Sequence, residues 1–111
     1  MIVDVHCHID LYPDIDDVIN RAKQANIVAV VAASMDPNSI EAILKLSRRF
    51  PDFVHPCLGL HPDSSKRITE KDLERALNLI RRSSEDLVAI GEIGLDHYFV
   101  TVSYTHLTLP T

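Results

Sequence analysis

The sequence is short of cysteine and has no long apolar run, and each shortage excludes a class of protein. Its 111 residues include two cysteines, Cys7 and Cys57, both within apolar segments. Disulfide frameworks belong mainly to small secreted domains, so we expect two buried, reduced thiols. No apolar run approaches the ~18 residues that a membrane span needs, and no basic signal-peptide segment precedes the first apolar run. These absences predict a soluble, cytoplasmic protein that does not bind membranes.

Positive charge is also scarce. Eleven Lys and Arg residues oppose sixteen Asp and Glu residues, which gives a formal net charge of −5. This balance argues against nucleic-acid or membrane binding driven by charge alone. It leaves open a nucleic-acid substrate that is held locally through metal ions. The three glycines form no phosphate-binding loop after an apolar run, which disfavours a dinucleotide-binding fold.

Apolar runs and helical patterns alternate along the chain. The predicted strands cover residues 2–7, 27–33, 53–60 and 87–95. Asp14 precedes the first helical pattern, Asp36 and Pro37 open the second, and Thr69 with Asp72 forms a capping box before the third. Continuous apolar strands that alternate with helices indicate a parallel α/β sheet, buried on both faces, with right-handed crossovers. We assign this domain to residues 1–100.

The last eleven residues, 101–111, break the alternation. A helix is due after the fourth strand, but the segment TVSYTHLTLPT is rich in threonine and has neither a cap nor helical periodicity. It resembles the foreign ends of truncated gene sequences. We therefore expect residues 101–111 to lie outside the fold, and the rest to be the N-terminal half of a longer protein.

The segment DVHCHID, residues 4–10, places polar side chains in an apolar strand. Because side chains alternate along a strand, Asp4, His6 and His8 share one face, and Cys7 points to the other. Two imidazoles at this spacing, at the carboxyl end of a strand, can bind one metal ion. Asp4 is then a candidate acceptor that fixes the tautomer of an imidazole. A purely structural role for the histidine pair is the alternative.

Three further polar residues lie at or near predicted strand ends. Glu92 lies within the apolar run AIGEIGLD, and no Lys or Arg lies in any of the four predicted strands. Because an unpaired buried charge is costly, a metal ion is the favoured partner of Glu92. His61, in LGLHP after the third strand, is a candidate for proton transfer or phosphate binding. Asp96 follows the fourth strand and is either a turn residue or a substrate contact.

Taken together, DVHCHID, LGLHP and AIGEIGLDHYF resemble, in order and spacing, the TatD family of metal-dependent hydrolases over about residues 1–100. The resemblance implies a (β/α)8 TIM-type barrel, of which this chain holds four strands and three helices. It implies two divalent cations per intact subunit (Mg, Zn or Mn), with His6 and His8 on one ion and Glu92 binding or bridging both. It also implies hydrolysis of phosphodiester bonds, foremost in DNA, with His61 and Asp96 lining the active site.

Two other interpretations stay open. A PHP-type phosphoesterase or an amidohydrolase barrel also uses a His-x-His pair, and the missing half would distinguish them through its strand-end ligands. The second alternative is a non-catalytic fragment. A barrel of this type takes ~250 residues, and three protein ligands fall short of the ~4 of closed zinc sites and the ~6 of magnesium. Bound metal and nuclease turnover would decide between fragment and enzyme.

Overall fold

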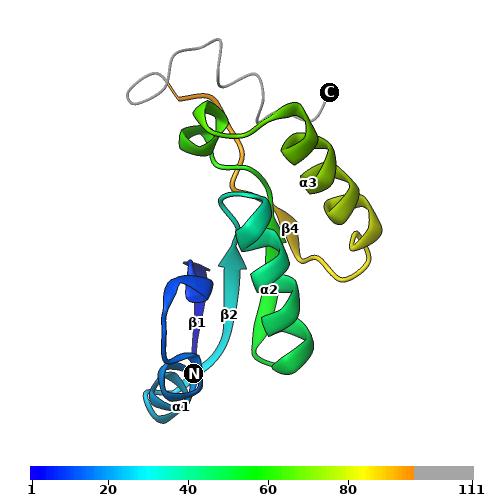
Figure 1. Cartoon of the computed structure of the whole chain (residues 1–111). Coiled ribbons are helices and arrows are strands. Elements are labelled where there is room, and N and C mark those ends of the chain that lie inside the picture. Colours follow the sequence, from blue (N-terminus) through cyan, green and yellow to red (C-terminus); the bar gives the residue numbers. More distant parts are fainter. Residues whose placement is uncertain (97–111) are drawn as a thin grey trace.

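The computed structural model describes residues 1–96, and within them four parallel strands alternate with three α-helices (Figure 1). The strands are β1 (Ile2–Cys7), β2 (Ile27–Ala33), β3 (Val54–Leu58) and β4 (Ala89–Ile90), side by side in that order. The helices are α1 (Ile15–Gln24), α2 (Pro37–Arg49) and α3 (Glu70–Arg82). Two short 3-10 helices, η1 (Ile9–Leu11) and η2 (Pro62–Lys66), follow β1 and β3. The predicted strand–helix alternation is confirmed.

Capping side chains set the starts of α2 and α3. The Asp36 carboxylate accepts the backbone N–H of Ser39 at 2.8 Å, and the Asp36 backbone N–H donates to the Ser39 hydroxyl at 3.3 Å. Thr69 and Asp72 form the same reciprocal pair before α3, at 3.1 and 3.0 Å. These bonds satisfy N–H groups that a helix start leaves free. Asp14 stands at the start of α1, but its side chain makes no capping bond.

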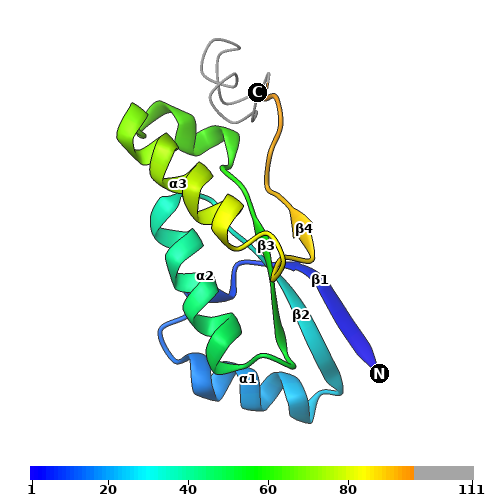
Figure 2. The same cartoon turned by 90° about the vertical axis from the view of Figure 1, so that its right-hand side faces the viewer.

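The core lies between the sheet and the helices, which gather on one side of the strands (Figure 2). Its buried members are Ile9, Ile19, Val30, Ala32, Ile40, Ile43, Leu44, Phe53, Val54, Leu58, Leu60 and Ala76. Cys7 packs against this core as predicted, Cys57 is buried, and both are free thiols. Burial raises the pKa of Cys7 to about 11. Within residues 1–96, no helix is both long and apolar enough to cross a membrane.

The outer strands depart from the prediction that every strand is buried on both faces. Val5 on β1 is 72% exposed and Ile90 on β4 is 49% exposed. A closed barrel pairs every strand edge, whereas four strands leave two edges and the inner face without partners. The outer strands of the sheet that residues 1–96 form therefore expose apolar side chains that the sequence pattern predicts to be buried.

The fourth strand is shorter than predicted. Only Ala89 and Ile90 pair with β3, against an expected strand over residues 87–95. Their partner strand ends at Leu58, so no ladder is available for residues further along. Glu92 consequently lies just beyond a strand end rather than inside a strand. The tail, residues 101–111, lies outside the described residues.

Candidate metal centre

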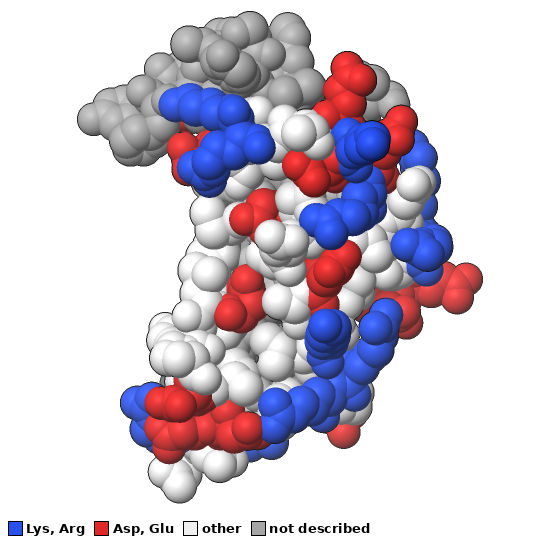
Figure 3. Space-filling view, viewed as in Figure 1, with Lys and Arg blue, Asp and Glu red and all other residues white. Residues whose placement is uncertain are grey.

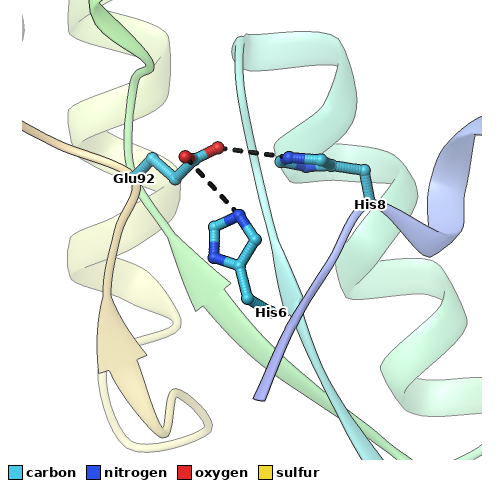
Figure 4. A group of neighbouring side chains, drawn as sticks. All are labelled: His6, His8 and Glu92. Carbon is cyan, nitrogen blue, oxygen red and sulfur yellow. Dashed lines mark ion pairs between the residues drawn. The ribbon is translucent and has the colours of Figure 1, made fainter. Parts of the chain in front are cut away.

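Two histidines from β1 and its end meet the carboxylate that follows β4 (Figure 4). The candidate ligand atoms of His6, His8 and Glu92 all lie within 4.8 Å of one another. The His8 Nε2 is 3.3 Å from Glu92 Oε2, and the His6 Nε2 is 3.6 Å from Glu92 Oε1. In a flat sheet, three strand spacings would separate β1 from β4 by about 14 Å. Curling of the sheet is therefore what brings these side chains together.

The tautomer of His8 follows from its second ring nitrogen. The Nδ1 atom lies 2.9 Å from the backbone carbonyl oxygen of Ala33. A carbonyl oxygen can only accept, so Nδ1 carries the hydrogen, and in the neutral ring Nε2 holds a lone pair. That lone pair faces the carboxylate of Glu92, which is also an acceptor. Such a pair of acceptors requires a proton or a metal cation between them.

The burial of the Glu92 carboxylate is a second feature that favours a bound cation. Its side chain is only 25% exposed, and its buried Oε2 accepts no hydrogen bond within the described part of the chain. A carboxylate oxygen that is removed from water without a hydrogen bond is costly. The ion pairs that Glu92 makes are with the imidazoles of His6, His8 and His61. A divalent cation would satisfy both the orphaned oxygen and the bare imidazole nitrogen.

His61 has the opposite tautomer. It stands at the start of η2, where its Nδ1 accepts the backbone N–H of Asp63 at 3.1 Å. The neutral ring therefore carries its hydrogen on Nε2, which lies 3.9 Å from Glu92 Oε1. An N–H in that position suits hydrogen-bond donation to a substrate oxygen and does not suit metal ligation. The sequence placed His61 near the site, and the structure adds the direction of its proton.

A pocket of about 320 Å³ opens beside Glu92, and His61 and Asp96 both line it. Pro62, Asp63, Ile93 and Leu95 complete its wall. The pocket is thus continuous with the carboxylate that faces the two histidines. Asp96, predicted from its place after the fourth strand, lies where a bound substrate could reach it.

Asp4 contacts backbone rather than an imidazole. Its Oδ1 accepts the N–H of His6 at 3.1 Å, while the tautomer of His8 is fixed by the carbonyl of Ala33. The hydrogen bond made by Asp4 thus steadies the strand at the first histidine. The specific expectation that Asp4 orients an imidazole has no counterpart among the described contacts.

Asp10 is a partly buried carboxylate near His8 that the sequence analysis did not single out. It lies in η1, two residues after His8, and its Oδ1 is buried without a hydrogen-bond partner. Burial raises the pKa of this carboxyl group, although His8 nearby opposes the effect. Asp10 is the final residue of the segment DVHCHID, so the sequence did place an acidic residue close to the histidine pair. Strand alternation did not reveal it because the 3-10 helix η1 begins at Ile9, before Asp10 is reached.

Known proteins are similar to this chain in sequence and in fold. The family model for TatD related DNase matches residues 3–107. A human protein named deoxyribonuclease TATDN3 is 44% identical over 86% of this chain, and the Bacillus subtilis metal-dependent hydrolase YabD is 31% identical over 89%. The crystal structure of YjjV, a TatD homologue from Escherichia coli, superimposes with a TM-score of 0.77 at 27% identity, over 95% of this chain.

These matches also define how much of a barrel is present. The chain spans 38% of the human relative, 39% of the Bacillus relative and 41% of the Escherichia coli structure. This coverage fits the four parallel strands and three helices of a half-barrel, so the predicted fold class is confirmed. Since the family model matches nearly the entire sequence, the chain belongs to the TatD related DNase family.

Proposed function

We propose that this chain carries the N-terminal part of a divalent-metal-dependent hydrolase that cleaves phosphodiester bonds, with DNA as its substrate. The observation that carries the proposal is the 3.3 Å approach of two acceptors, His8 Nε2 and Glu92 Oε2. The names of the relatives, deoxyribonuclease and metal-dependent hydrolase, support the reaction class. The cytoplasmic location stays a prediction.

His6, His8 and Glu92 are the residues that would hold the cation. Two imidazole nitrogens and a carboxylate suit zinc or manganese, and the carboxylate also suits magnesium. When bound, the cation would polarise a phosphoryl oxygen and lower the pKa of water. Three protein ligands leave positions for water and substrate, as catalytic sites require. A second ion would need ligands from outside residues 1–96.

The chain's own residues have separable tasks in this scheme. The Ala33 carbonyl holds the proton of His8 on Nδ1, which keeps Nε2 free for ligation. His61 lines the pocket, and its Nε2–H can donate a hydrogen bond to an oxygen of the bound phosphodiester. Glu92 can also accept a proton from the attacking water. Asp96 lines the same pocket and is proposed to contact the substrate.

Charge on the helical face does not supply a general surface for DNA. Figure 3 shows acidic and basic side chains interspersed over this face. Ion pairs of the helices include Arg75 with Glu41 and Arg21 with Asp17. With a net charge of −5, the attraction for a phosphodiester has to come from cations in the site. This agrees with a substrate that is recognised locally at the carboxyl ends of the strands.

The short coverage of the relatives favours a second candidate, in which the 111-residue chain alone is non-catalytic. Metal binding and nuclease turnover separate the two. We expect the chain to bind Mn²⁺ in calorimetry and to lose binding in His8→Ala. The matched control is His55→Ala, because His55 lines a different pocket on β3. Binding without turnover on DNA assigns the non-catalytic candidate, and absence of binding in the wild type contradicts the proposed metal site.

A further inference from the structure

One buried serine ties the ends of β2 and β3 together. Ser34 directly follows β2 and is 0% exposed. Its hydroxyl donates to the carbonyl oxygen of Gly59 at 2.7 Å and accepts the N–H of the same residue at 2.8 Å. A single hydroxyl thus serves both backbone groups of Gly59, which lies just beyond β3. This fixes the position of Gly59 relative to the end of β2.

Gly59 in turn lies against the backbone that carries Glu92. A Cβ atom at Gly59 would lie 2.4 Å from the Glu92 carbonyl oxygen and 2.7 Å from the Gly91 carbonyl carbon. Only a glycine permits two backbones to approach this closely. The Glu92 N–H also points at the Ser34 carbonyl oxygen, 3.4 Å away. The backbone at Glu92 is therefore seated on the unit formed by Ser34 and Gly59.

Ala33, the residue before Ser34 and the last of β2, contacts His8, which faces Glu92 in the site. Ala33 accepts from His8 Nδ1, and Ser34 seats Glu92 through Gly59. Two consecutive residues at one strand end thus govern both sides of the 3.3 Å approach between His8 and Glu92. We infer that Ser34 is a positioning residue, whose hydroxyl sets the place of Glu92 relative to His8. The effect of Ser34 on metal binding rests on the proposed function. Its effect on the distance between His8 and Glu92 does not, because that distance can be probed without metal.

Removing the hydroxyl tests this inference. We expect Ser34→Ala to weaken Mn²⁺ binding to the 111-residue chain about tenfold or more, as loss of groups that orient ligands typically does. Ser47→Ala is the matched control, because its hydroxyl also donates to a backbone carbonyl, that of Leu44 at 2.8 Å, but within α2. The control should keep wild-type affinity. Ser34→Ala with wild-type affinity, in a protein with an unchanged circular dichroism spectrum, would overturn the inference.

A metal-free measurement separates this inference from the proposed function. In the wild type we expect a nuclear Overhauser contact between the His8 imidazole and the Glu92 side chain, and its loss in Ser34→Ala. If the wild type binds no Mn²⁺, the proposed function fails while this contact still reports on Ser34. If Ser34→Ala does not fold, Ser34→Cys keeps the size of the side chain and weakens the donor. Persistence of the contact in a folded variant of either kind refutes the role of the serine hydroxyl.

Discussion

His8 and Glu92 follow the two outer strands of the sheet, β1 and β4, yet Nε2 of His8 is 3.3 Å from Oε2 of Glu92. The proton of His8 is on the far nitrogen, held by the carbonyl of Ala33. The approach is thus unfavourable for the neutral imidazole and favourable once a cation lies between the two groups. The short distance between His8 and Glu92 thus reports on the curvature of the sheet, and the same two side chains are proposed to bind the cation.

Glu92→Gln should abolish metal binding without unfolding the protein. The amide keeps the size of the side chain, and its N–H can donate to the bare Nε2 of His8, so the metal-free variant should be at least as stable as the wild type. A bound ligand stabilises the folded state by mass action, by about 2.7 kcal/mol at one hundred times its Kd. Thermal unfolding with and without Mn²⁺ should therefore show a metal-dependent rise in Tm only in the wild type. An equal rise in both proteins would contradict the role of Glu92.

His61→Gln should separate hydrogen bonding to the substrate from metal binding. Because the His61 Nδ1 accepts from Asp63 and its Nε2 carries the hydrogen, His61 acts as a donor in our scheme. We expect Mn²⁺ affinity to remain within about threefold of the wild type. In a form of the protein that has nuclease activity, kcat should fall by about 10² to 10³, the range for loss of one hydrogen-bond donor to the transition state. A large loss of Mn²⁺ affinity would instead identify His61 as a ligand.

Cys7 should be unreactive in the folded protein. Burial raises the pKa of its thiol to about 11 from an ordinary value of 9.0, so at pH 8 the thiolate fraction is about a hundredfold lower than in the unfolded chain. The pKa of Cys57 is raised as well, by burial and then by Glu92. Alkylation with iodoacetamide at pH 8 should be slow in buffer and fast in denaturant. Rapid labelling of the native chain would show that these thiols are not packed as described.

The parts of the fold that were predictable from sequence have strong local chemistry. The capping residues Asp36 and Thr69 mark real helix starts, because the bonds that they make involve residues only three positions away. The length of β4 was not predictable, since a strand continues only as far as its partner, and β3 ends at Leu58. Likewise, the exposure of Val5 depends on which strands are present and not on its own neighbours.

The candidate site also contains residues that were predictable from sequence and residues that were not. Alternation along one strand was enough to group His6 with His8, and the absence of a basic partner was enough to single out Glu92. The positions of Ser34 and Gly59 were not predictable, because their role depends on how closely two separate backbones approach. Asp10 escaped for a different reason, since it lies in a 3-10 turn where strand periodicity no longer applies.

Thr69→Ala should destabilise the protein through the start of α3. The Thr69 hydroxyl accepts the N–H of Asp72 at 3.1 Å, and the Asp72 carboxylate accepts the N–H of Thr69 at 3.0 Å. Loss of a helix cap typically costs about 1 kcal/mol in the free energy of unfolding. Thr69→Ser is the matched control, because it keeps the hydroxyl and should keep most of the stability. Urea unfolding at pH 7 measures both variants.

The same cap has a pH dependence of known sign. The hydrogen bonds with Thr69 lower the pKa of Asp72 below its usual 3.8 in the folded state. The charged carboxylate therefore contributes stability above pH 3.8, and this contribution is lost as the pH falls through the lower folded-state pKa. Since Thr69→Ala weakens the interaction, its deficit relative to the wild type should shrink as Asp72 becomes protonated in acid. A deficit that stays constant from pH 7 to below pH 3 would show that the Thr69 hydroxyl does not interact with the charged Asp72 carboxylate, since the variant keeps the backbone N–H of residue 69.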